Sequence, residues 1–160
     1  MTLLLWRLLT LLLASLSMAL SFCHVMELAP RLLWAPELWM QTTNFGGLYY
    51  LFGRVGAVID VGTVVVAAVL VVLSRGRSRP FRLALAGAIL FAIALATWFG
   101  VVAPMNGIMA HWSEGSVPAG FYGVRNQWEF GHATVWLIKF LGLTCLFLSV
   151  LTETPKQKPI

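Results

Sequence analysis

Four long apolar stretches constrain the fold of this chain more than any other feature. They cover about residues 3–28, 48–73, 81–109 and 128–151. Each is long enough to cross the hydrocarbon core of a bilayer as a helix, which takes about 20 apolar residues. Only 11% of the 160 residues are charged, against roughly 25% in a soluble domain. The sequence therefore predicts an all-α integral membrane protein, a four-helix bundle in which residues 1–160 form a single transmembrane domain.

Arginines crowd into the short segment between the second and third stretches, where residues 74–82 contain four of them. Short basic loops stay on the cytoplasmic side of a membrane. Because four spans return the chain to its starting side, we expect both termini in the cytoplasm, at an inner or plasma membrane. The formal net charge of +5 comes largely from this orientation signal, so nucleic-acid binding is not expected.

The two connections on the opposite side differ in character. Pro36 followed by Glu37 is typical of the first turn of a helix, and we expect a short interfacial helix between the first and second spans. Residues 113–126 contain three glycines and a proline, which predicts an irregular loop.

The first apolar stretch also fits a second interpretation. Residues 3–20 resemble the apolar core of a secretory signal peptide, with small residues at 15–21 as a cleavage region. Against cleavage, Arg7 is the only early positive charge, and Phe22 does not suit a lipoprotein cleavage before Cys23. We therefore expect the first span to be retained, while cleavage stays open as the alternative.

Ionisable residues inside the spans carry the functional signal, because each costs roughly 2.5–3.5 kcal/mol at the centre of a membrane helix. They follow single helix faces at steps of three and four residues. With the topology above, all four spans bring polar groups to the outer half of the bundle, and the cytoplasmic half is nearly all apolar apart from Lys139. The sequence therefore predicts a polar pocket open to the outside. Its candidate residues are His24, Glu27, Arg54, Asp60, Asn106, His111, Glu129 and His132.

Two cofactor hypotheses fit these residues. The pair Glu129 and His132 has the Glu-x-x-His spacing of carboxylate-bridged di-metal bundles. His24 and Glu27 in the reversed order, with Asp60, complete the candidate ligand set for iron or copper, which is one carboxylate short. His24 and His132 on separate helices also fit a haem held between two histidines.

A structural hypothesis fits the same residues. Arg54 could pair with Asp60 or Glu27, and His132 with Glu129, as polar contacts between membrane helices. The chain would then be a non-catalytic structural or accessory membrane subunit. Lys139 on its own is expected to pair or to extend towards the membrane surface. Assembly as a homo-oligomer stays open.

Short motifs around the third and fourth spans resemble a known family. Residues 103–106 are Ala-Pro-Met-Asn, and residues 125–132 are Arg-Asn-Gln-Trp-Glu-Phe-Gly-His. In a four-span chain of this length, this combination resembles the DUF1772 family, the anthrone-oxygenase-like family of small membrane proteins, along nearly the whole chain. The matching positions are Pro104, Asn106, Trp128 and His132.

The resemblance implies an oxidoreductase that adds molecular oxygen to a hydrophobic, aromatic or phenolic small molecule without a metal or flavin. No obligatory cofactor is then expected, and the partners are the lipid bilayer and that small molecule. A histidine serves as the base, a glutamate orients it, polar donors stabilise the oxyanion, and tryptophans stack on the ring. The expected catalytic residues are His132, His24, Glu129, Glu27 and Asn106. The expected substrate-binding residues are Trp112, Trp128, Trp136, Arg54, Asp60 and His111. Among these, Glu27, Asp60 and Glu129 lie outside the matching motif and are included for their positions in the spans.

Overall fold

Helices account for nearly all of the described chain. The computed structural model describes residues 2–153, and these contain no strand. Two of the elements, η1 and η2, are π-helical turns. The elements in order are α1 (Thr2–Leu32), α2 (Pro36–Met40), η1 (Gln41–Phe45), α3 (Leu48–Leu73), α4 (Ser78–Thr97), η2 (Trp98–Val102), α5 (Ala103–Met109) and α6 (Phe121–Leu151). The all-α fold and the short helix between the first two spans are thereby confirmed.

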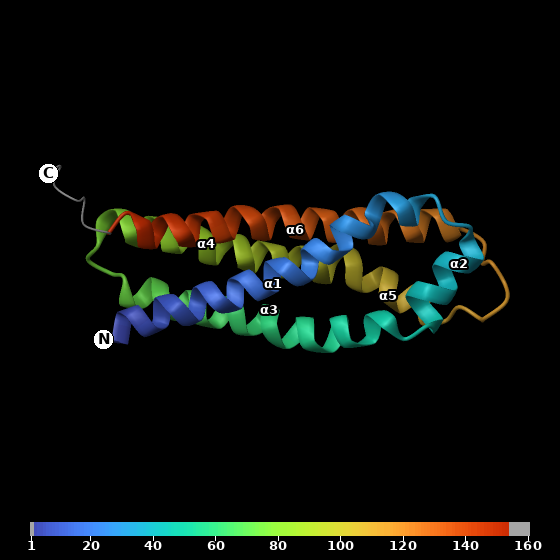
Figure 1. Cartoon of the computed structure of the whole chain (residues 1–160), viewed down its shortest axis with the longest axis horizontal. Coiled ribbons are helices and arrows are strands. Elements are labelled where there is room, and N and C mark those ends of the chain that lie inside the picture. The colour runs from blue at the N-terminus through green and yellow to red at the C-terminus, as the bar shows by residue number, and fades with distance from the viewer. Residues whose placement is uncertain (1, 154–160) are drawn as a thin grey trace, which may run out of the picture.

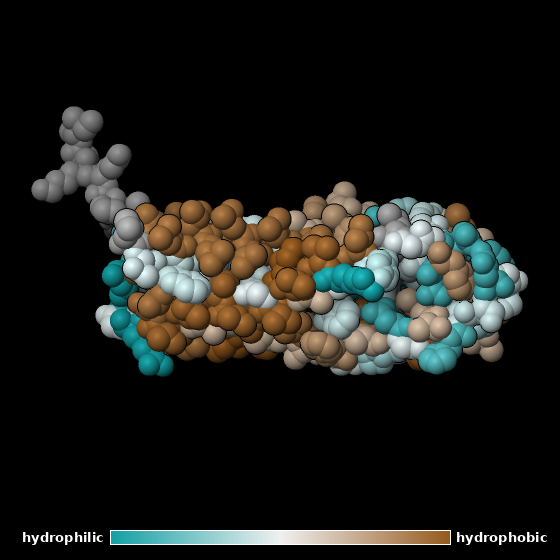
Figure 2. Space-filling view, turned by 90° about the horizontal axis from the view of Figure 1, so that it is seen from below, coloured by the Kyte–Doolittle hydropathy of each residue, from teal (hydrophilic) through white to brown (hydrophobic). Residues whose placement is uncertain are grey.

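Four helices are long and apolar enough to cross a membrane, and they run lengthwise through the molecule (Figure 1). They are Thr2–Leu32, Tyr50–Leu73, Ser78–Met109 and Phe121–Leu151. The start of α1, the turn between α3 and α4, and the end of α6 share one end of the bundle, and α2 covers the other (Figure 1). On the face seen in Figure 2, apolar surface covers most of the half away from α2, while the α2 end is more polar.

The last helix begins earlier than the glycine-rich sequence predicts. The prediction of an irregular loop over residues 113–126 is wrong for its final part, because α6 starts at Phe121. Gly120 precedes this start in the left-handed region, with φ of 79°, which glycine adopts without steric cost. The Arg125 guanidinium then donates to the Leu32 carbonyl oxygen at 3.2 Å. This contact ties the first turns of α6 to the end of α1, a stabilisation that residue propensity does not reveal.

Glycines set the distance between α4 and α6, the pair of helices with the most extensive contact. A Cβ on Gly87 would lie 2.7 Å from Leu146 Cγ, and one on Gly142 would lie 3.0 Å from Phe91 Cδ2. Small residues let membrane helices approach closely, so that dispersion contacts replace the missing hydrophobic driving force. This close packing fixes the position of α6, the helix that carries His132.

A π-helical turn interrupts the third span where it passes the candidate site. Pro104 has no backbone N–H, so it cannot form the helical hydrogen bond to the carbonyl of Gly100. The turn η2 covers Trp98–Val102, immediately before α5. Such turns are frequent at functional sites. Here the turn places Trp98 and Phe99 in the wall of a cavity.

Candidate functional site

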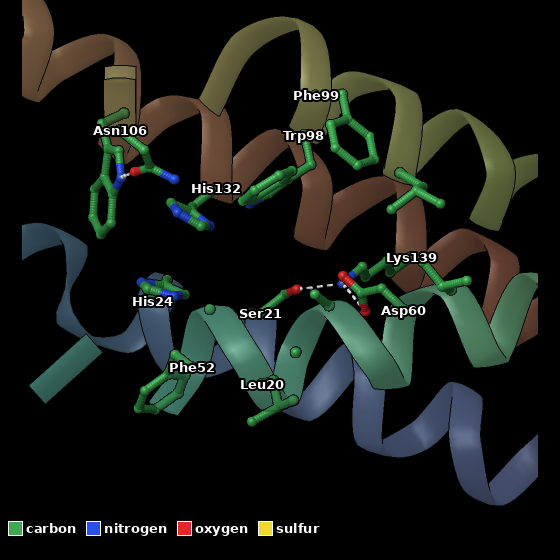
Figure 3. A pocket seen from close by; sticks show the side chains of 16 residues that line it. Leu20, Ser21, His24, Phe52, Asp60, Trp98, Phe99, Asn106, His132 and Lys139 are labelled. Atoms are coloured by element: carbon green, nitrogen blue, oxygen red, sulfur yellow. Dashed lines mark hydrogen bonds and ion pairs between the residues drawn. The ribbon is translucent and has the colours of Figure 1, made fainter. Parts of the chain in front are cut away.

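A cavity of about 130 Å³ lies within the bundle, lined by α1, α3, α6 and the third span (Figure 3). Its size is close to that of one aromatic ring, since an engineered cavity of about 150 Å³ binds benzene. Aromatic and aliphatic side chains form most of its wall, and polar groups stand at both ends. The lining residues are Leu20, Ser21, His24, Phe52, Gly53, Gly56, Ala57, Asp60, Val61, Leu95, Trp98, Phe99, Asn106, Trp128, His132 and Lys139.

The two predicted histidines meet at one end of this cavity. The rings of His24 on α1 and His132 on α6 stack with their centroids 4.0 Å apart and their planes inclined by 16°. Both residues are buried. Trp128 packs edge-on against both rings, at centroid distances of 5.3 and 4.4 Å. Its Nε1 donates to Asn106 Oδ1 at 2.7 Å. Three helices, α1, α5 and α6, therefore converge on one group of side chains.

An ion pair stands at the other end of the cavity. Lys139 Nζ lies 2.8 Å from both carboxylate oxygens of Asp60 and 2.9 Å from Ser21 Oγ. Ser17 Oγ donates to Asp60 Oδ1 at 2.6 Å. Lys139 is only 3% exposed, so a carboxylate balances its charge inside the bundle. The sequence suggested Arg54 as a partner for Asp60, but the Arg54 guanidinium lies 4.1 Å from the ring centre of Tyr50.

Glu129 belongs to a second buried polar cluster. Arg31 Nε donates to Glu129 Oε1 at 2.8 Å, and Trp39 Nε1 donates to the same oxygen at 2.7 Å. Arg31 also donates to Thr43 Oγ1 at 2.8 Å and to Glu27 Oε2 at 3.2 Å. Arg31 and Glu129 are 0% and 1% exposed. Both glutamates that were expected to orient a histidine thus contact Arg31.

This second cluster also contacts the histidine end of the cavity. The Arg31 guanidinium lies 4.9 Å from the ring centre of Trp128, close enough for a cation–π interaction. Trp128 in turn packs against both His24 and His132. Arg31 and both histidines therefore contact the same indole ring.

Four predicted substrate-binding residues lie elsewhere. Trp112 packs against Trp39 and Phe121, at centroid distances of 6.4 and 5.7 Å. Trp136 packs against Phe22 and Phe140, at 5.7 and 5.8 Å. His111 and Arg54 are exposed, and His111 Nδ1 lies 2.8 Å from the carbonyl oxygen of Gly107 in α5. Of the residues that the structure describes, the cavity lining includes none of these four.

The site contains residues that sequence reasoning did not select. Lys139 lies two turns after His132 on α6, so its helical spacing already pointed to the same face. Helical spacing does not predict that Trp98 and Phe99 face the cavity, because the π-helical turn changes the direction in which their side chains point. Arg31 lies beyond the first apolar stretch, which ends at about residue 28, but α1 continues through Pro30 and holds it inside the bundle.

The arrangement of donor groups bears on both cofactor hypotheses. Within residues 2–153, no three His, Cys, Asp or Glu side chains lie close enough together to hold a metal ion. A haem with both histidines as axial ligands would need its macrocycle between the two rings. Rings stacked at 4.0 Å leave no room for it, so this conformation does not fit such a haem.

No family model, curated protein or solved structure matches this chain. The residues that carry the resemblance nevertheless have a clear spatial relationship. Asn106, Trp128 and His132 come together at one end of the cavity, and Pro104 follows the π-helical turn that forms part of its wall. Fold and site together define a helical membrane protein with a mainly apolar cavity that bears polar groups at both ends.

Proposed function

We propose that the chain is a membrane-embedded, oxygenase-like protein that oxidises a hydrophobic aromatic or phenolic molecule without an obligatory cofactor. The observation that carries this proposal is the stacked pair of His24 and His132 beside Asn106, at the end of an aromatic-lined cavity. The resemblance of the motif residues to the anthrone-oxygenase-like DUF1772 family supports the same chemistry.

The reaction begins with removal of a proton from the bound ring system. His132 or His24 takes this proton, acting as a general base. The resulting carbanion reacts with molecular oxygen, and a carbon–oxygen bond forms. For a ring CH₂ group the balance is one CH₂ and one O₂ giving one carbonyl and one water. Oxygen is the oxidant, so the protein has only to bind, deprotonate and stabilise the anion.

Asn106 is suited to stabilise the negative charge on oxygen. The indole N–H of Trp128 can only donate, so the atom that it contacts in Asn106 must be the amide oxygen. The amide NH₂ of Asn106 is thereby fixed as a donor in the cavity lining. A preorganised donor next to a developing oxyanion lowers the reaction barrier.

The substrate reaches the cavity from the lipid in this proposal. Gly53, Ala57, Val61 and Phe99 line the cavity and are also exposed on the outside of the bundle. In a bilayer that outer surface contacts acyl chains, in which an apolar ring system dissolves. Residues 74–82 face the cytoplasm of an inner or plasma membrane with both termini, and the histidines lie in the opposite half.

Replacement of His132 tests the proposal. Oxygen uptake is measured with purified protein and an anthrone-type substrate in detergent micelles. His132→Ala is expected to lower turnover by about 10²- to 10⁴-fold, the usual contribution of a general base, and His132→Phe does the same while retaining a ring against His24. His111→Ala is the matched control, because His111 is exposed outside the cavity. Undiminished turnover in both His132 variants would reject this role.

A purely structural role is the second candidate, and the ion pairs favour it. Lys139 with Asp60 and Arg31 with Glu129 join separate helices through internally balanced charges. Such a protein has no turnover of its own and acts by contact with another membrane subunit. It predicts that His132→Ala changes thermal stability or co-purification of a partner and leaves oxygen uptake at background.

A further inference from the structure

The proposed reaction uses the histidine end of the cavity and leaves the ion pair at the other end unexplained. Lys139 and Asp60 both line the cavity. If they served only to join helices, apolar side chains of similar volume would do as well, since replacing a buried ion pair in this way is often neutral or stabilising. Their position in the cavity wall is the geometric basis for a role in binding.

Hydrogen bonding within the pair leaves the carboxylate as the group able to receive a ligand. Lys139 has three N–H donors, and Asp60, Ser21 Oγ and the Ser17 carbonyl oxygen lie within 2.8 to 3.4 Å of its Nζ. A carboxylate has about four acceptor sites. Asp60 accepts from Lys139 and Ser17 Oγ, and its side chain is 15% exposed against 4% for Lys139. Asp60 therefore retains acceptor capacity for an O–H group that arrives through the cavity.

The separation of the two polar ends sets the length of the ligand. His132 and Lys139 are two turns apart on α6, about 10 Å of axial rise. In Figure 3 the histidines stand at one end and Asp60 with Lys139 at the other, with Trp98 along the wall between them. The enclosed volume of about 130 Å³ is close to that of one ring, so a molecule that reaches both polar ends must be longer than the enclosed space. We therefore expect a flat fused-ring molecule, part of which lies along the side of the cavity where Ala57 and Val61 are exposed.

We propose that Asp60 forms a second ligand-binding subsite, which accepts a hydrogen bond from a hydroxyl group at the edge of the substrate remote from the reacting atom. The substrate class is then a fused aromatic molecule with oxygen substituents at both edges. Lys139 holds the Asp60 carboxylate in place through their ion pair. The inference rests on the proposed function, which assigns the reaction to the histidine end of the cavity. It adds that the substrate carries a hydroxyl group at its other edge, where Asp60 binds it.

A pair of matched probes isolates the remote hydroxyl group. The probes are 2,6-dihydroxynaphthalene and 6-methyl-2-naphthol, which differ by one hydroxyl in place of a methyl group of similar size. Binding to the full chain in detergent is followed under argon by quenching of tryptophan fluorescence. The measured quantity is the ratio of the two dissociation constants, compared between wild type and variants so that partitioning of each probe into micelles cancels.

Two variants remove the subsite in different ways. Asp60→Asn removes the charge of the acceptor but leaves Lys139 without its counter-ion, so it carries a risk of misfolding. The double variant Asp60→Leu with Lys139→Met removes both charges together and avoids a lone buried ammonium group. Thr63→Val is the control on the same helix, because Thr63 is buried, donates within α3 to Ile59 O and lies outside the cavity lining.

The ratio of the two dissociation constants is expected to favour the dihydroxy probe about tenfold more in wild type and Thr63→Val than in the double variant. This factor corresponds to the loss of one hydrogen bond to a charged group. An unchanged ratio in the double variant would overturn the subsite, as would failure of wild type to bind either probe. Oxygen uptake is measured separately. A preference that depends on Asp60, without any turnover, refutes the proposed oxidation and leaves the subsite standing.

Discussion

The imidazole rings of His24 and His132, on the first and last helices, stack with their centroids only 4.0 Å apart. At this distance the two rings are in van der Waals contact, so each histidine helps to fix the position of the other. Trp128 closes the edge of the pair and contacts Asn106. A change at one histidine is therefore expected to act on both packing and chemistry, and the two effects need separate variants.

Replacement of His24 by phenylalanine and by alanine separates packing from proton transfer. His24→Phe keeps a ring against His132 and Trp128, whereas His24→Ala removes the contact. We expect His24→Ala to lower the free energy of unfolding by about 1 kcal/mol more than His24→Phe, the usual size of an aromatic pair contribution. Thermal unfolding in detergent gives this difference. If His24 shares the role of base, oxygen uptake falls in both variants, and full activity in His24→Phe would confine His24 to packing.

Loss of Arg31 leaves a buried charge without its counter-ion. Arg31→Met is expected to destabilise the protein by about 3–5 kcal/mol, because Glu129 is 1% exposed and receives a hydrogen bond from Arg31. The double variant Arg31→Met with Glu129→Met removes both charges and is expected to recover most of that loss. Denaturant or thermal unfolding of the two variants measures the difference, and equal destabilisation in both would contradict a dominant charge effect.

A methyl group added at Gly87 has no space. Its Cβ would lie 2.7 Å from Leu146 Cγ and 3.0 Å from the Gly142 carbonyl oxygen, and Leu146 is fully buried. We expect Gly87→Ala to destabilise the bundle by about 1–3 kcal/mol through overpacking. Gly107→Ala is the control, because nothing lies within 4 Å of its added Cβ. A neutral Gly87→Ala would show that α4 and α6 can move apart at little cost.

Low pH is expected to reduce the stability of the fold through Glu153, which contacts Arg7 of α1 and Arg77 before α4. Burial opposes ionisation of Glu153, but hydrogen bonds and charges from Arg7 and Arg77 outweigh it and lower the pKa of Glu153 below its ordinary value of 4.5. A lowered pKa in the folded state stabilises the fold at neutral pH, and this contribution is lost as the pH falls below about 4.5 and through the lowered pKa. Thermal unfolding measured from neutral pH down to about pH 3 should show this loss. Glu153→Gln should be less stable at neutral pH and change less over the same range.

The topology can be tested with single cysteines. In a chain with Cys23 and Cys145 replaced by alanine, Ser116→Cys and Ser78→Cys place one thiol at each end of the bundle, both at exposed positions. A membrane-impermeant maleimide added to intact cells is expected to label Ser116→Cys. Ser78→Cys is expected to be labelled only after the membrane has been permeabilised. Labelling in the opposite order would reverse the proposed orientation.

The sequence was sufficient to predict the helical class, the four apolar helices and the short helix at Pro36–Met40. It also selected His24, Asp60, Asn106, Trp128 and His132, all of which line one cavity. The helices, and His24, Asp60 and His132, were predictable because apolar length and helical spacing are local properties of the chain, whereas Trp128 was selected through the motif that resembles a known family. Periodicity assigns a residue to a face of its own helix, and the faces that carry His24 and His132 are buried, whereas Arg54 and His111 are exposed.

Which polar group contacts which was decided only in the folded bundle. The sequence by itself determined that charges would lie inside the spans, since their positions along each helix are fixed by its regular rise. The partners depend on how the helices are rotated and on where they begin, which Gly87, Gly131 and Gly142 at close contacts and the π-helical turn before Pro104 decide. For this reason Lys139 rather than Arg54 pairs with Asp60, and Arg31 pairs with Glu129.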